Sequence, residues 1–305
     1  MSEIKTPEAE YLYHYTDPRG LLGIGTSKSL WASNIRYLSD STEYLHAVRV
    51  ALSIVQNMEN VTQQEREFFD YLLGHSQVGA WIRSRQFGAQ YYVVSLTKRP
   101  DLLSQWRTYA PKSGYCIGWR VDVLERAAKL NDFALMTCLY KPEEQRVMVK
   151  PVVEGALQRW RENPCALNFS GPFWAPREET AITAYTQLIK HTYDFDAHFG
   201  QVATVCKHES FEEEAEWRLV CHDSPIKRIQ PVRFREGRSV LIPFVEFSLE
   251  FESMGIGQVE AQTRIICGPS PESDLAQNSA MNLFATNAWY GGTWSSQSQV
   301  PYRDW

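Results

Sequence analysis

The sequence lacks the motifs that mark the common nucleotide-dependent enzymes and hydrolases. It contains no G-x-G-x-x-G, no P-loop, no G-x-S-x-G and no paired-histidine metal motif. Its six cysteines stand singly, without a C-x-x-C pair or a histidine at zinc-site spacing. We therefore expect reduced, buried thiols rather than a disulfide framework or a zinc centre.

Long apolar runs and basic charge are also scarce. No segment approaches the roughly 20 apolar residues of a membrane helix, and residues 1–10 are polar and acidic, unlike a secretory signal. The net charge is -5, whereas proteins that bind nucleic-acid backbones usually carry a clustered basic surface. These absences predict a cytoplasmic protein without a membrane partner.

The elements that are present indicate an α+β fold. The 305 residues are 44% hydrophobic, which is enough for a substantial core. Several predicted strands are separated by helical hairpins, and this favours a single α+β domain at 11–285 with a central mixed or antiparallel sheet. Helical insertions are expected at 40–86 and 143–199. A tail at 1–10 precedes the domain, and an irregular tail at 286–305 follows it.

The run Tyr11–Thr16 is a predicted strand that presents His14 and Thr16 on one face. Asp17-Pro18 then starts a helix, because Asp caps free N–H groups and proline is tolerated at the first helical position. An imidazole and a hydroxyl placed together can bind ribose hydroxyls or a base. The plainer alternative is a core histidine that bonds to a backbone carbonyl.

A second candidate is the acidic run that ends in Glu214, Glu216 and Arg218. A carboxylate held at the start of an apolar strand can stabilise positive charge on a sugar carbon, as in glycosidases. The alternatives are a solvated acidic run and a structural ion pair between Glu216 and Arg218.

Aromatic residues supply flat rings that can stack on nicotinamide or adenine. Tyr37 and Tyr44 flank a capped turn, and Ser95 ends a strand that begins with two tyrosines. Most such rings lie in a core, as we expect for Trp106. Gln105 lies off that apolar helix face and is freer to meet a ligand.

Several segments, in this order, resemble the bacterial family of domain of unknown function 2971. The resemblance covers about Tyr11 to Pro269 and implies no activity. It rests on Tyr13-His14-Tyr15-Thr16, Leu30-Trp31-Ala32, the stretch 36–43, Leu103-Ser104-Gln105-Trp106-Arg107, the stretch 114–119, the stretch 211–220 and Ile266-Cys267-Gly268-Pro269.

A more distant resemblance is to ADP-ribosyltransferases, which open with an H-x-T-like strand and a short helix and place a catalytic glutamate on a late strand. It implies that NAD is the cofactor, with His14 and Thr16 binding it and Glu216 acting in catalysis, supported by Glu214 and Arg218. The residue stacking on nicotinamide would be Tyr37, with Tyr44 behind it. Ser95 is an equally good start for the stacking segment.

The resemblance leads us to expect an ADP-ribosyltransferase-like enzyme that modifies a protein or nucleic acid, as a toxin or phage-defence effector with a regulatory protein partner. One alternative is a non-catalytic sensor that binds a nucleotide or a phage protein in the same pocket. Another is a metal-dependent nuclease using Asp40, Glu43, Glu214 and Glu216.

Overall fold

The computed structural model describes residues 10–38, 43–73, 90–111, 113–167, 179–223 and 231–301. Within these ranges, helices and strands follow one another without a regular βαβ repeat. The elements, in chain order, are β1 (Tyr11–Thr16), α1 (Pro18–Ser27), β2 (Ser29–Asn34), η1 (Ile35–Tyr37), α2 (Glu43–Gln56), α3 (Gln63–Leu72), β3 (Gln90–Thr97), α5 (Leu103–Tyr109), β4 (Tyr115–Arg120), α6 (Val121–Leu130), β5 (Ala134–Thr137), α7 (Pro142–Glu162), α8 (Glu179–Ala203), η2 (Glu209–Glu214), β6 (Glu216–Asp223), β7 (Arg233–Glu236), β8 (Leu241–Ser248), β9 (Thr263–Cys267), α9 (Ser273–Thr286) and β10 (Thr293–Gln297).

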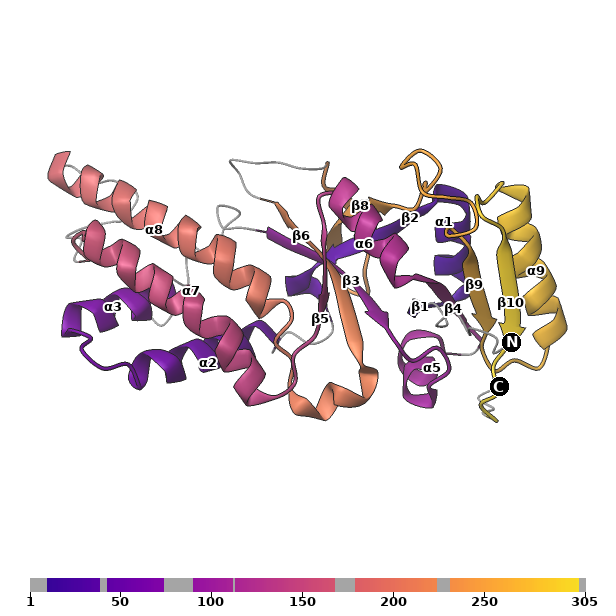
Figure 1. Ribbon diagram of the computed structural model, residues 1–305, viewed down its shortest axis with the longest axis horizontal. Helices are drawn as coiled ribbons and strands as arrows, with labels where there is room; N and C mark the ends of the chain where they lie inside the picture. The colour runs from indigo at the N-terminus through magenta and orange to yellow at the C-terminus, as the bar shows by residue number, and fades with distance from the viewer. Residues whose placement is uncertain are drawn as a thin grey trace, which may run out of the picture.

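One mixed sheet organises the described residues (Figure 1). Its strand order is β10-β9-β4-β1-β3-β2-β8-β7, while β6 pairs with β3 and β5 pairs with β6. The β9 and β10 strands are parallel, and the other described pairs are antiparallel. The predicted α+β class with a mixed central sheet is confirmed.

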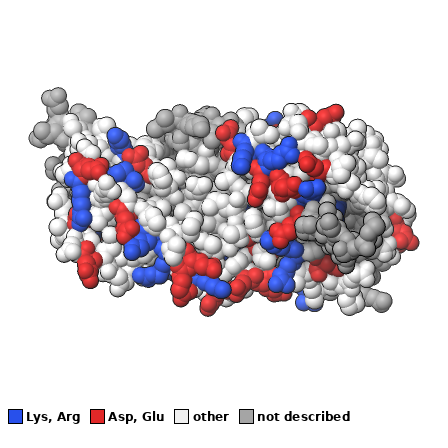
Figure 2. Space-filling view, in the orientation of Figure 1, with Lys and Arg blue, Asp and Glu red and all other residues white. Residues whose placement is uncertain are grey.

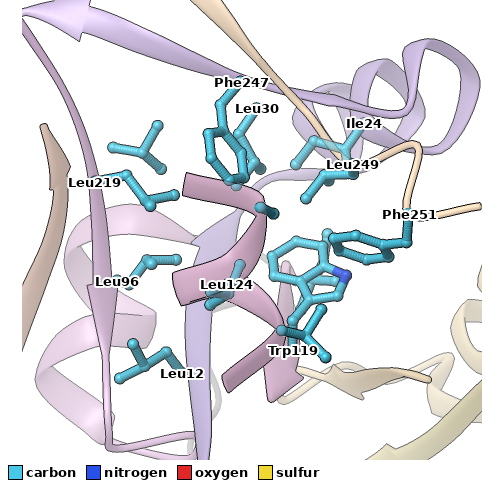
Figure 3. Close-up of a cluster of buried hydrophobic side chains, with 14 of the residues drawn as sticks. Leu12, Ile24, Leu30, Leu96, Trp119, Leu124, Leu219, Phe247, Leu249 and Phe251 are labelled. Carbon is cyan, nitrogen blue, oxygen red and sulfur yellow. The ribbon is translucent and has the colours of Figure 1, made fainter. Parts of the chain in front are cut away.

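The largest core lies on one face of this sheet. Leu12 of β1, Leu96 of β3 and Leu219 of β6 point into it, together with Ile24 of α1 and Leu124 of α6 (Figure 3). Alternate residues of a strand share a face, so the neighbours of these leucines point to the other side of the sheet. The helices α1, α6 and α9 therefore cover one face, because all three contribute buried residues to this cluster.

The two predicted helical insertions pack together as one lobe of α2, α3, α7 and α8 beside the sheet (Figure 1). Phe68 of α3 stacks on Trp160 of α7, with ring centroids 4.3 Å apart. Thr62 and Glu65 form a capping box at the start of α3, and Glu65 also binds Arg161 of α7 at 2.6 Å. Residues 39–42, which form the predicted capped turn between Tyr37 and Tyr44, lie outside the described residues.

The C-terminal tail corrects the sequence prediction. Residues 286–305 were expected to be irregular, but Thr293–Gln297 forms β10. Its pairing with β9 and the bonds from Gln277 of α9 to Ser295 hold this strand in place, and local propensity does not indicate them.

Other broad expectations concern cysteines, membranes and charge. All six cysteines are buried and free, as expected. No helix of the described ranges is long and apolar enough to span a bilayer. On the face shown in Figure 2, Lys and Arg side chains are interspersed with Asp and Glu, so neither charge forms a broad continuous area.

Candidate functional site

Three strands meet along β3 and leave a fork in the sheet. β6 pairs with the whole length of β3 on one edge. On the other edge, β2 pairs at Tyr92 and Val93, whereas β1 pairs at Thr97. Residues 94–96 lie between these two pairings, where β1 and β2 diverge. We call this position the fork.

The fork contains an exposed residue in the middle of the most central strand. Ser95 is exposed, although Val94 and Leu96 on either side of it are buried. His14 of β1 reaches into the fork, and its Nδ1 lies 2.9 Å from the main-chain oxygen of Ser95. Because strand carbonyls point sideways within a sheet, the imidazole lies at the level of the sheet between β1 and β3.

The hydrogen bond fixes the tautomer of His14. A carbonyl oxygen only accepts, so Nδ1 carries the proton and Nε2 of the neutral ring is an acceptor. Burial lowers the pKa of His14 below its usual 6.5, and the bond to Ser95 opposes this shift only in part. The imidazole is therefore neutral at pH 7.

The strand register places the predicted acidic residues on the same face as Ser95. Ser95 lies opposite Arg218, and Thr97 lies opposite Glu216; directly opposed residues of antiparallel strands project to the same face. Tyr13 lies opposite Thr97, so the alternation of β1 sends the Cβ of His14 to the other face. His14 and Glu216 therefore project from opposite faces of the sheet.

A buried cluster of charges underlies Ser95. Arg218 donates to Glu216 from Nε at 2.8 Å and from Nη2 at 3.2 Å, and from Nη1 to the Thr204 carbonyl at 2.5 Å. The Nζ of Lys207 donates to Oε2 of Glu216 at 2.6 Å and to Oε2 of Glu214 at 2.5 Å, so it links the two glutamates. Glu216, Arg218 and Lys207 are exposed by only 4%, 2% and 4%. The structural ion pair considered from the sequence is therefore present.

The charges in this cluster stabilise each other. Burial by itself raises the pKa of Glu216, but the Arg218 and Lys207 charges and their hydrogen bonds outweigh it and hold this pKa at about 2. The same attraction to Glu216 and Glu214 raises the pKa of Lys207 in spite of burial. Glu216 and Lys207 are therefore both ionised at pH 7.

Glu214 differs from Glu216 in position and in exposure. It belongs to η2 rather than to β6, and the left-handed Ala215 separates the two elements. The Glu214 side chain is 18% exposed, compared with 5% for Glu216. Oε2 of Glu214 bonds to Lys207, and within the described residues Oε1 has no hydrogen bond. Glu214 is the carboxylate of this cluster that faces solvent.

The structure separates the remaining predicted ligand-binding residues. Gln105 of α5 was expected to be free to meet a ligand, but it is buried, with only 6% of its surface exposed. The next residue, Trp106, packs edge-on against Tyr15 of β1 at 4.7 Å. Tyr37 in η1 is 43% exposed. Thr16 is buried against the first turn of α1, on the far face from Ser95. The backbone of Tyr44 is in α2, but its side chain lies outside the described residues.

Sequence reasoning missed Lys207 and Tyr140. Lys207 links the two glutamates, and the Tyr140 hydroxyl accepts a hydrogen bond from the Glu216 amide at 2.8 Å. The only local signal was a single lysine shortly before four glutamates. Tyr140 lies 76 residues before Glu216, and nothing in its surroundings indicates the contact.

The segment that carries this charge cluster is also the one that the comparisons identify. Residues 105–219 match the model of DUF2971, a protein family of unknown function. The DUF2971 segment includes Gln105, Lys207 and all three predicted catalytic residues, whereas His14 and Ser95 precede it. Searches of curated proteins and of solved structures found no match.

The nuclease alternative needs several acidic ligands close together. Among the described residues, no three His, Cys, Asp or Glu side chains are grouped so that they could hold a metal ion. Asp40, one of the residues named for that function, lies outside the described ranges.

Proposed function

We propose that this chain binds NAD at the fork and transfers ADP-ribose to a macromolecule. The observation that carries the proposal is the contact between His14 and the carbonyl of Ser95, the residue that lies opposite Arg218 on the neighbouring strand. Through the backbone of β3, it links a neutral imidazole on one face of the sheet to an exposed serine and a carboxylate cluster on the other face, although these residues come from three distant parts of the chain.

Each group has a role in this proposal. The free Nε2 of His14 accepts a hydrogen bond from a ribose hydroxyl, and Ser95 leaves room for the sugar. As the bond between ribose and nicotinamide breaks, its electron pair leaves with nicotinamide and positive charge develops on the ribose. A nearby carboxylate stabilises that charge. The target nucleophile then attacks the same carbon.

Glu214 is the better placed carboxylate for contact with the ribose. Both oxygens of Glu216 are bonded to Lys207 and Arg218, whereas one oxygen of Glu214 is available. In the proposed mechanism, Glu216 is a positioning residue that holds Lys207, and Lys207 in turn fixes Glu214. The ADP-ribosyltransferase resemblance implied Glu216 as the catalytic residue, whereas we propose Glu214.

The test is to incubate purified protein with NAD, with and without cell lysate, and to measure released nicotinamide and labelled macromolecules. Glu214→Gln should remove nicotinamide release, while Glu212→Gln, an exposed change in the same helix, should leave it intact. Equal release by wild type and Glu214→Gln, or no release by wild type with lysate present, would refute the transfer proposal.

A second candidate is a sensor that binds the nucleotide without reacting. It is favoured by the bonding of Glu216, whose two oxygens are both occupied within a 4% exposed side chain. In this case NAD binds with equal affinity to wild type and Glu214→Gln, and neither protein releases nicotinamide. A toxin or phage-defence role, and a regulatory protein partner, fit either candidate.

A further inference from the structure

A second set of polar and aromatic residues lies beside the fork, on β2, β8 and β7. Ser33 of β2 lies opposite Val93 on one side and Phe244 on the other, and Arg233 of β7 also lies opposite Phe244. Residues two apart on a strand share a face. Trp31, Ser33, Phe244, Arg233 and Arg235 therefore share the face of Ser95. We call Trp31, Ser33, Phe244 and Arg235 the β2–β7 surface; Arg233 is left out of it because Glu246 pairs with it.

Arg235 is a partly buried cation on this surface that has no acidic partner among the described residues. Its Nη2 donates to the Ser33 hydroxyl at 3.1 Å, and no carboxylate of the described residues forms an ion pair with it. Burial lowers the pKa of Arg235 below its usual value. A guanidinium in this position has N–H groups left to donate to an anion. Its planar arrangement of parallel N–H donors matches the geometry of phosphate oxygens.

Arg233 lies two residues earlier on the same strand and face, but unlike Arg235 it has an acidic partner and is exposed. It binds Glu246 at 2.9 Å, and its side chain is 58% exposed. Arginines on an edge strand often serve only to block pairing with other chains, and Arg233 fits that role. Arg235 does not, because it turns inward onto Ser33.

Trp31 supplies an exposed ring on the same surface. It is 45% exposed, although Leu30 and Ala32 on either side are 1% and 0% exposed. Its ring stacks on the buried Phe244, with centroids 4.5 Å apart and planes at 23°. A ring supported in this way loses little freedom when a base stacks on it.

We propose that the β2–β7 surface binds the adenosine diphosphate half of the dinucleotide, with Arg235 bonding to a phosphate and Trp31 stacking on adenine. This inference rests on the proposed function of the fork and extends it. Ser33 pairs with Val93, which is two residues, or roughly 7 Å, from Ser95 along β3. One ligand can therefore reach both places, with its nicotinamide ribose at the fork.

The test is calorimetric titration with ADP, which lacks the nicotinamide riboside half. Arg235→Gln should weaken ADP binding at least tenfold, as expected for the loss of a charge-assisted hydrogen bond. Arg233→Gln removes the same charge from the same strand and should change affinity less than twofold. Trp31→Ala should weaken binding roughly fivefold or more. Trp294→Ala, which removes a 66% exposed tryptophan from β10, should have no effect.

The outcomes separate this inference from the transfer proposal. Equal effects of Arg235→Gln and Arg233→Gln, or no ADP binding by wild type at millimolar concentration, would overturn the inference. If NAD releases nicotinamide while Arg235→Gln leaves its KM unchanged, the transfer proposal stands and this inference fails. If ADP binding depends on Arg235 but NAD stays intact, the inference stands and the transfer proposal fails. Near-UV circular dichroism of each variant confirms its fold.

Discussion

Replacing Glu216 by Gln removes the central charge of the buried cluster and should destabilise the fold strongly. The pKa of Glu216 falls from 4.5 to about 2 on folding, and at 1.36 kcal/mol per unit this corresponds to about 3 kcal/mol. Removing one member of a buried ion pair typically costs about 3 to 5 kcal/mol, because Lys207 and Arg218 stay buried beside a neutral amide. We therefore expect a loss of this size in the free energy of unfolding at pH 7.

The pH dependence of the free energy of unfolding tests whether the lost charge of Glu216 causes this destabilisation. A carboxylate with a depressed pKa contributes its full stability above pH 4.5 and loses it as the pH falls towards 2. The difference between wild type and Glu216→Gln should shrink over this range. Urea unfolding at several pH values measures it, with Glu212→Gln as the exposed control. A change below 1 kcal/mol at pH 7, or a difference that does not vary between pH 5 and 2, would refute the reasoning.

Three further outcomes test other parts of the structure. NMR titration should give His14 a pKa below 6.5, and a pKa above that value would contradict its desolvated position in the fork. Thr62→Ala should cost about 1 kcal/mol in urea unfolding, because it removes the cap of α3; no change would show that the cap is dispensable. Gly118→Ala should cost about 1 to 3 kcal/mol, because its Cβ would overlap the Tyr13 ring. Gly23→Ala, with open space around residue 23, should not destabilise the protein.

The sequence predicted the elements that local patterns define. Strand β1, the β3 strand around Ser95 and the long helices α7 and α8 follow from alternation and helical spacing. Strand β10 was missed because its Gly- and Ser-rich surroundings give no strand signal, and pairing with β9 creates it. The packing of the two helical insertions into one lobe could not be predicted from local sequence either, because their contacts join segments about 100 residues apart.

In the candidate site too, local patterns predicted some features, whereas others depend on contacts between distant residues. Alternation predicted that His14 points away from its tyrosine neighbours, and the start of an apolar strand singled out Glu216. The partner of His14 is 81 residues away, and Ser95 became important only because β1 and β2 diverge beside it. The Lys207 and Arg218 bonds also decided which glutamate we propose for catalysis, and the sequence could not indicate this because burial and ion pairing depend on tertiary packing.

Calorimetric titration of NAD into wild type and Ser95→Trp tests most directly whether the fork is the nucleotide site. Ser95 is exposed and lies opposite Arg218, so a tryptophan there is compatible with the strand and occupies the position proposed for the sugar. Ser296→Trp, on the exposed strand β10, is the matched control. We predict that NAD binds to wild type and to Ser296→Trp but not to Ser95→Trp. Equal NAD binding by all three proteins, or no binding by wild type, would contradict the assignment.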